Sequence, residues 1–403
     1  RQSHKEIDIY LSQINLINVR NYSRLNMDLP EGIVFINGNN GHGKSNLLEA
    51  IHILVAGKSQ RAINDSEIVL RNDNIVKDHA QISVNVVRKD QNISKVEMDL
   101  ISKNISSYSN EFVDRENEKL IKFNKVFKVN GNIIKVSDFI GRINAVIFTA
   151  KDLDLVYGGP NLRRKYLDLF ISQMDKKYIK CLQNFNRIVS QRNHLLKAIR
   201  SKKSSEDQLE QWDDFLVDSA QYLIRSRSKV IQSLTEKAKP LHSELSKNDS
   251  VLDIKYQPSI KIDTDSSVEE NSDFIKNLFE SNRSKELHEG VTLFGPHRDD
   301  FLMTLDEGGI ASYSSRGQSR TFLLALKLAE AELLTKMSGE EPILLLDDIM
   351  SELDKFRQSY IMDRLTHYQQ CIVTSAESEI LNQNVLPIMN SFNVENGSIT
   401  KKF

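Results

Sequence analysis

The sequence is poor in cysteine and has no long hydrophobic run. Its 403 residues contain two cysteines, Cys181 and Cys371, and neither has a second cysteine or a histidine at metal-ligand spacing. This argues against a disulfide framework and a structural zinc site. No apolar stretch approaches the roughly 20 residues that a membrane-spanning helix needs. Residues 1–8 lack an apolar signal core, so we expect them to be a leader or a cloning remnant outside the fold of a cytoplasmic protein with no membrane partner.

The chain also has almost no net charge, −1 at pH 7, but its charges are segregated. Residues 161–203 carry 12 Lys and Arg against two Asp, a local charge of 12 − 2 = +10. Residues 204–219 reverse the sign, with six Asp and Glu and no basic residue. Such segregation permits a basic surface on a protein that is neutral overall. With 39% hydrophobic residues, the chain is long enough for one large core or two globular domains.

A glycine-rich segment, GNNGHGKS at residues 38–45, lies between the apolar run Gly32–Ile36 and a helix-like stretch over residues 46–54. The order of strand, glycine loop and helix is typical of a loop that binds nucleotide phosphates. Lys44 would reach the β and γ phosphates of ATP, and the Ser45 hydroxyl would bind Mg²⁺. The alternative is an ordinary surface turn. The predicted nucleotide contacts in this segment are Gly38, Asn39, Asn40, Gly41, His42, Gly43, Lys44, Ser45 and Asn46.

A second chemical element is the apolar run over residues 343–346, which is followed by Asp347 and Asp348. Such a run predicts a buried parallel strand that ends in two carboxylates. Asp347 would contact Mg²⁺, and Asp348 would orient or deprotonate the attacking water, because adjacent acids can divide these roles. With Lys44 they form the predicted catalytic set. The alternative is a core strand that simply ends in solvated acids.

Residues 314–320, SSRGQSR, precede an Ala- and Leu-rich helix and resemble the signature motif of ABC-type ATPases. The resemblance implies that Ser315, Gly317 and Gln318 grip the ATP of a second subunit, so the homodimer closes only on ATP. A plain helix cap is the alternative reading of the same serines. Residues 351–354 resemble the D-loop of this superfamily. Thr374 stands where transporters carry a switch histidine, which favours slow hydrolysis.

Three further segments, residues 18–22, 152–168 and 294–300, resemble the RecF family of bacterial recombination mediators. The family pattern usually has Pro-Glu before Asp152, where this chain has Ala150 and Lys151. Membership implies a weak, DNA-stimulated ATPase that uses ATP and Mg²⁺. It also implies an ATP-dependent homodimer that binds DNA at single-strand gaps and ss–ds junctions. Such a protein would help RecO and RecR to load RecA, and would serve DNA replication and SOS induction.

The resemblance implies an α/β fold, namely an ABC-type P-loop ATPase head with a mixed sheet and an antiparallel β layer, plus a helical second lobe. We expect the N-terminal half of the head over residues 9–150. An antiparallel helix hairpin would follow over residues 151–249, with its second helix ending near Pro240. The C-terminal half of the head would occupy residues 250–403.

The basic hairpin helix is suited to phosphate contacts without base readout. The predicted DNA contacts are Arg163, Arg164, Lys176, Lys177, Arg187 and Arg192. The alternative is a solvated charged face that is balanced by the acidic helix. A transport-type ABC ATPase subunit is the alternative function. A long coiled-coil structural protein does not fit, because Ser45 and Ser315 are only 315 − 45 = 270 residues apart.

Overall fold

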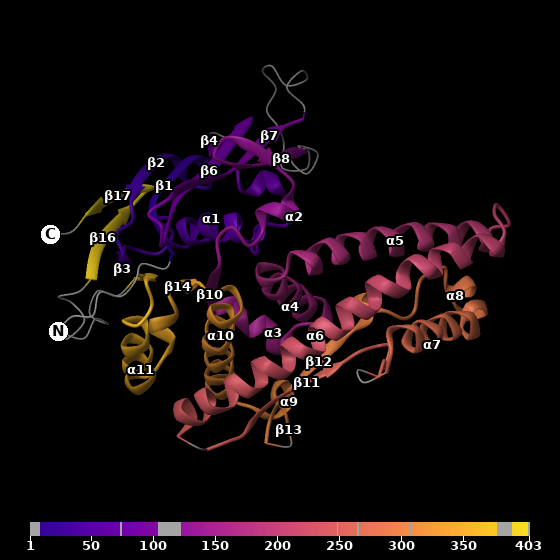
Figure 1. The fold of residues 1–403 in the computed structure, drawn as a ribbon. Coiled ribbons are helices and arrows are strands. Elements are labelled where there is room, and N and C mark those ends of the chain that lie inside the picture. The colour runs from indigo at the N-terminus through magenta and orange to yellow at the C-terminus, as the bar shows by residue number, and fades with distance from the viewer. Residues whose placement is uncertain are drawn as a thin grey trace. The chain divides into compact units, whose positions relative to one another are not determined.

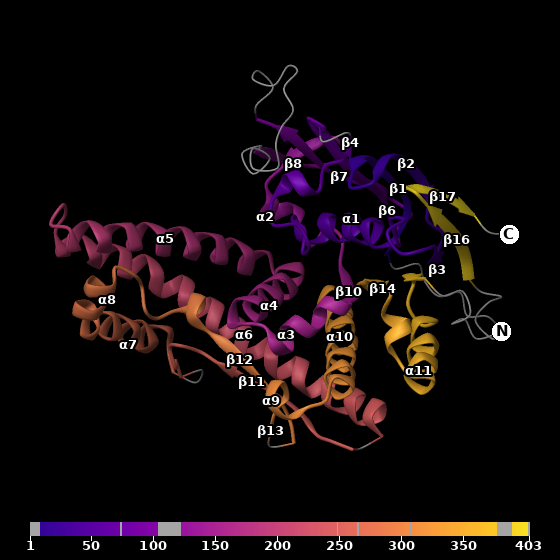
Figure 2. The same cartoon turned by 180° about the vertical axis from the view of Figure 1, so that it is seen from behind.

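The computed structural model describes residues 9–72, 75–103, 122–247, 249–263, 266–306, 308–376 and 389–401. The expected leader, residues 1–8, lies outside the described residues. The chain divides into two compact units (Figures 1 and 2). The first, here called the head, combines the chain up to Asp152 with the chain from Glu330 onward. The second, here called the lobe, is Leu153–Ala329.

The lobe is longer than the sequence suggested, because residues 250–329 were expected in the head. Strand β11 (Leu252–Gln257) and strand β12 (Asp300–Leu305) form an antiparallel pair. That pair is attached to a long lobe helix, α6 (Leu209–Ser246). The Thr235 hydroxyl bonds to the Ile254 carbonyl at 3.1 Å, and Lys239 pairs with Asp253 at 3.0 Å. These contacts join the strands to the hairpin.

One sheet of the head is mostly parallel and carries the predicted nucleotide-binding segments. Its strand order is β10-β14-β15-β3-β16-β17, and only the β16–β17 pair is antiparallel. The strands are β3 (Gly32–Asn37), β10 (Ala145–Thr149), β14 (Ile343–Asp347), β15 (Gln370–Ser375), β16 (Met389–Glu395) and β17 (Ser398–Lys401). The expected mixed sheet is thereby confirmed.

The second sheet of the head is antiparallel throughout, in the order β2-β1-β6-β7-β8-β9. Its strands are β1 (Ile9–Val19), β2 (Tyr22–Asp28), β6 (His79–Arg88), β7 (Ile93–Ser102), β8 (Phe123–Val129) and β9 (Asn132–Ile134). A short pair, β4 (Arg71–Asn72) and β5 (Ile75–Val76), stands apart from it. The expected antiparallel layer is confirmed.

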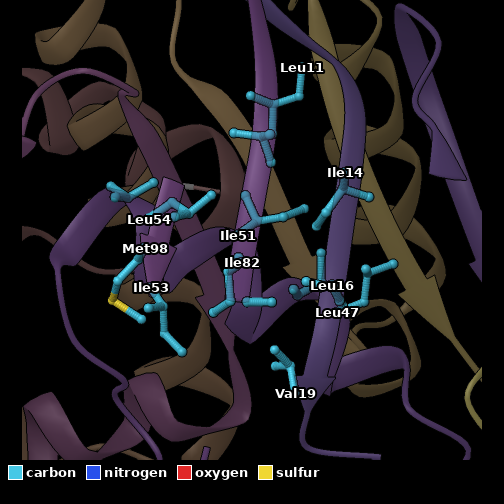
Figure 3. Close-up of a cluster of buried hydrophobic side chains, with 14 of the residues drawn as sticks. Leu11, Ile14, Leu16, Val19, Leu47, Ile51, Ile53, Leu54, Ile82 and Met98 are labelled. Carbon is cyan, nitrogen blue, oxygen red and sulfur yellow. The ribbon is translucent and has the colours of Figure 1, made fainter. Parts of the chain in front are cut away.

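Helix α1 (Lys44–Ala56) lies in the core of the head. Its side chains are buried around almost the whole helix, as expected for a helix covered on more than one face. Figure 3 shows Leu47, Ile51 and Leu54 of α1 among the side chains of β1, β6 and β7, including Ile14 and Ile82. The helix that follows the phosphate loop is therefore fixed by packing. The other head helices are α2 (Val136–Phe139) and α11 (Lys355–Leu365).

The lobe is built on an antiparallel hairpin of α5 (Lys176–Arg200) and α6, which Figures 1 and 2 show side by side. The expected end of the second helix at Pro240 is wrong, because α6 continues to Ser246. Proline removes one hydrogen bond, and Leu241 and Leu245 are buried beyond it. The remaining elements of the lobe are α3 (Leu153–Tyr157), α4 (Pro160–Met174), α7 (Val268–Ser281), α8 (Arg283–Glu289), β13 (Gly308–Gly309) and α9 (Ile310–Tyr313). Helix α10 (Arg316–Ser338) begins in the lobe, and its residues from Glu330 onward belong to the head.

Candidate functional site

The glycine loop turns sharply between β3 and α1. Gly43, the residue before the helix, has φ +122°. A Cβ at this position would lie 2.7 Å from Asn21 Nδ2 and 2.8 Å from the Tyr22 hydroxyl. Both side chains bond to the loop, Asn21 to the His42 carbonyl at 2.9 Å and Tyr22 to the Gly43 carbonyl at 2.9 Å. Only glycine fits this backbone and this close approach.

Lys44 is buried and its side chain turns back over the loop. Its Nζ donates to the Gly38 carbonyl at 2.6 Å and to the Asn39 carbonyl at 3.1 Å. Burial lowers the pKa of Lys44, and the nearby carboxylates of Asp348 and Asp347 oppose that shift. The loop backbone thus holds the lysine cation inside its curve, which is the position that a phosphate-binding lysine needs.

The structure brings Ser45 and Asp347 together although they are 302 residues apart. The Ser45 hydroxyl donates to Asp347 Oδ1 at 2.8 Å. Strand order explains the meeting, because β15 lies between β14 and β3, and the carboxyl ends of parallel strands share one edge of the sheet. A hydroxyl and a carboxylate are hard oxygen ligands that suit Mg²⁺, which usually takes few ligands from the protein.

Asp348 has a left-handed backbone with φ +54°. Its N–H donates to the Thr374 hydroxyl at 3.1 Å and to the Thr374 carbonyl at 3.2 Å. One carboxylate oxygen accepts from the Ala376 N–H at 3.4 Å. Aspartate tolerates this conformation better than most residues, and the strand β15 fixes it beside Asp347.

The signature residues belong to the lobe, at the start of α10. The Ser315 hydroxyl accepts from the Gln318 N–H at 3.2 Å, while the Gln318 side chain accepts from the Ser315 N–H at 2.8 Å. This reciprocal pair is a capping box, so the helix-cap reading of Ser315 holds. Ser315, Gly317 and Gln318 are all exposed, which leaves them accessible to a partner.

A polar network beside the loop was not predicted from the sequence. Arg20 binds the buried Glu49 of α1 through two bonds of 2.7 and 3.0 Å and reaches the Glu67 carbonyl at 2.6 Å. Arg61 contacts Glu49 at 3.4 Å and Asn46 at 3.1 Å. Asn46 in turn donates to Asn21 at 2.9 Å. The sequence segment 18–22 was the available signal, but nothing in it pointed to Glu49 as the partner of Arg20.

Arg192 was wrongly assigned to DNA contact, because its side chain is fully buried. It binds Asp213 at 2.7 Å, Glu286 at 2.6 Å and Thr292 at 3.0 Å. A guanidinium in this environment is a structural link between α5, α6 and α8, out of reach of a DNA backbone.

Two further predicted DNA contacts are also engaged inside the lobe. Arg163 forms two bonds with Asp300, at 2.7 and 2.8 Å. Arg164 donates to the Asp299 carbonyl at 2.7 Å. Lys176, Lys177 and Arg187 are exposed on α5, as the predicted DNA contact requires.

The described residues contain neither a clustered metal site nor a membrane-spanning helix. Across those residues no group of three or more His, Cys, Asp and Glu side chains could hold a metal ion. Mg²⁺ usually takes few ligands from a protein, so the predicted pair of Ser45 and Asp347 needs no such group. Among the helices that the structure describes, none is long and apolar enough to cross a membrane.

The head combines a strand, a glycine loop and a helix with a second strand that ends in two acids. This arrangement defines a P-loop head of the ABC-type ATPase class. The family model "RecF/RecN/SMC N terminal domain" matches residues 10–400. The DNA replication and repair protein RecF of Bacillus subtilis (strain 168) is 33% identical over 395 residues, which cover 98% of this chain and 100% of that protein. The chain therefore belongs to the RecF family of DNA replication and repair proteins.

Other known proteins agree with this assignment. The RecF of Oceanobacillus iheyensis is 32% identical over 392 residues, or 97% of this chain and 100% of that protein. A solved structure of the recombination mediator protein RecF with ATPrS, in the RecFOR pathway, has a TM-score of 0.85 and 32% identity, with 100% of each chain covered. The Smc head domain of Pyrococcus furiosus has a TM-score of 0.53 at 14% identity, covering 98% of this chain and 96% of that one, and shows the shared fold. The RecF matches favour repair over the transport-type alternative.

Proposed function

We propose that this protein is an ATP-dependent DNA-binding protein of recombinational repair. It binds ATP with Mg²⁺, closes into a homodimer, and hydrolyses ATP slowly. In the closed state it binds DNA at single-strand gaps or ss–ds junctions and helps RecO and RecR to load RecA, in support of replication and SOS induction. The observation that carries the proposal is the 2.8 Å bond between Ser45 and Asp347, which joins the phosphate loop to the acidic strand end in one site.

The residues of the head divide the work on ATP. The loop from Gly38 to Gly43 and the N-terminus of α1 offer backbone N–H groups to the phosphates, and the buried Lys44 neutralises them. Ser45 and Asp347 would hold Mg²⁺, which screens phosphate charge when bound. Asp348 orients the attacking water and accepts its proton. A similar solved structure, of the recombination mediator protein RecF with ATP, supports the binding of ATP.

Ser315, Gly317 and Gln318 complete the site of a second subunit in the proposed dimer. Their exposure at the start of α10 supports this role, because it leaves them accessible to the ATP of a second subunit. The capping box keeps the Ser315 hydroxyl in place before the partner arrives. ATP then links the two subunits of the dimer, and hydrolysis of ATP lets them separate.

The proposed DNA contacts keep the predicted residues that are exposed on α5, Lys176, Lys177 and Arg187, and add the exposed Lys180. Lys176, Lys180 and Arg187 are exposed at spacings of four and seven residues along the helix, so they share one face. Phosphate contacts of this kind give affinity without sequence preference and weaken as salt rises.

Reversing the charge of that face should weaken DNA binding. We expect the triple variant Lys176→Glu, Lys180→Glu and Arg187→Glu to lose at least about tenfold in affinity for gapped DNA at 0.1 M salt. Each lost phosphate contact should also reduce the slope of log affinity against log salt by about 0.9. Fluorescence anisotropy with ATP and Mg²⁺ measures both quantities.

The matched control reverses three exposed lysines elsewhere on the lobe, Lys229, Lys261 and Lys285, all to Glu. It applies the same change in net charge, so only the position differs. An equal loss of affinity in both variants would show that α5 makes no particular contribution and would refute this DNA surface.

A further inference from the structure

Thr374 lies in the mostly parallel sheet of the head and has no assigned role in the proposed function. It is fully buried near the end of β15. Its register partners are Asp347 on β14 and Ile36 on β3. Thr374 therefore lies between the strand that carries the acids and the strand that leads into the phosphate loop.

The Thr374 hydroxyl contacts both acidic residues. Its Oγ1 lies 3.0 Å from Asp347 Oδ1 and 3.3 Å from the Leu346 carbonyl, and it accepts from the Asp348 N–H at 3.1 Å. A hydroxyl has one proton to donate. The shorter contact, to a carboxylate, is the stronger of its two possible donations. One side chain thus donates to Asp347 while it accepts from Asp348.

Both hydrogen bonds of the Thr374 hydroxyl act on acids of the proposed site, Asp347 and Asp348. Asp347 Oδ1 already accepts from Ser45 at 2.8 Å, so Thr374 holds the same oxygen from the side of β15. Asp348 has a left-handed backbone, which needs support from its surroundings to persist. The Thr374 hydroxyl and carbonyl both accept from its N–H and give that support.

We propose that Thr374 is a positioning residue that fixes the Asp347 carboxylate for the metal and the Asp348 carboxylate for water. The proposal rests on the proposed ATPase function. It predicts that loss of the hydroxyl weakens metal binding and turnover, while metal-free binding of ATP to the loop persists.

The test compares Thr374→Val, which keeps the shape of the side chain and removes the hydroxyl, with Thr374→Ser, which keeps the hydroxyl. Mn²⁺ affinity is measured by electron paramagnetic resonance with a slowly hydrolysed ATP analogue. Binding of a fluorescent ATP analogue in EDTA and ATP turnover against Mg²⁺ concentration are measured in parallel. Thr235→Val is the matched control, because Thr235 is a buried threonine of the lobe with a hydroxyl bonded to the Ile231 carbonyl.

We expect Thr374→Val to lose about tenfold in Mn²⁺ affinity and at least tenfold in turnover, with metal-free ATP binding within twofold of the wild type. Thr374→Ser should recover most of both losses, and Thr235→Val should match the wild type. If the wild type hydrolyses ATP and Thr374→Val keeps its Mn²⁺ affinity and turnover within twofold, this inference is wrong and the proposed function stands. Equal losses in the Ser and Val variants would also overturn it. A wild type that does not bind ATP would overturn both.

Discussion

Replacing Asp348 with Asn should lower ATP turnover at least about a hundredfold while ATP affinity stays within about threefold. The reason is that a positioned general base contributes roughly 10²–10⁴ in rate. Asn has the same shape, tolerates the left-handed backbone, and can still accept from the Ala376 N–H through its carbonyl oxygen. Phosphate release measures turnover, and a fluorescent ATP analogue measures binding.

The variant should also accumulate as a dimer with ATP, because the step that separates the subunits is blocked. Asp363→Asn is the matched control, since Asp363 is an exposed acid of α11 in the same unit. Turnover of Asp348→Asn within threefold of the wild type would remove Asp348 from the catalytic set.

Replacing Ser315 with Arg should abolish ATP-dependent dimerisation and leave ATP binding to the head unchanged. The exposed Ser315 directly precedes α10 and would contact the ATP of the other subunit. An arginine side chain is too long to fit there in the space of a serine hydroxyl. The lost helix cap should cost about 1 kcal/mol of stability, which is too little to unfold the protein. Analytical ultracentrifugation with and without Mg²⁺ and ATP measures the dimer.

Ser281→Arg provides the matched control, as Ser281 is an exposed serine at the end of α7. It introduces the same side chain on the same unit, away from the signature. Normal dimerisation of Ser315→Arg, or an equal defect in Ser281→Arg, would contradict a role of the signature between subunits.

The phosphate loop and the acidic strand could be predicted because their signals are local. The glycine loop is a short segment with its strand and helix attached, and a hydrophobic run that ends in Asp347 reads directly as a buried strand. The meeting of Ser45 with Asp347 also follows, since parallel strands share one carboxyl edge. The proximity of Ser45 and Asp347 in the candidate nucleotide site could therefore be predicted.

The partners of buried charges could not be predicted in the same way. Arg192 appears in a strongly basic stretch, and its partner Glu286 lies 94 residues further along the chain. Helical periodicity cannot distinguish a buried arginine from an exposed one when the compensating acid is so distant. The pairing of Arg20 with Glu49 could not be predicted for the same reason. The left-handed backbone of Asp348 could not be predicted either, because it depends on the β14–β15 register.

The extent of the lobe was missed for a related reason. Strand character after Ser250 suggested a return to the head, but β11 pairs with β12 and packs on α6. Strand pairing is decided by tertiary contacts that a short alternating pattern does not specify.

The most direct test of the account is the mass of the protein in solution, by light scattering, with and without ATP and Mg²⁺, together with its affinity for gapped DNA. The protein should be a monomer of 46.2 kDa without nucleotide and have twice that mass with ATP and Mg²⁺, and its DNA binding should rise with the dimer. A protein that stays at 46.2 kDa with saturating ATP, or that binds DNA equally in both conditions, would contradict it.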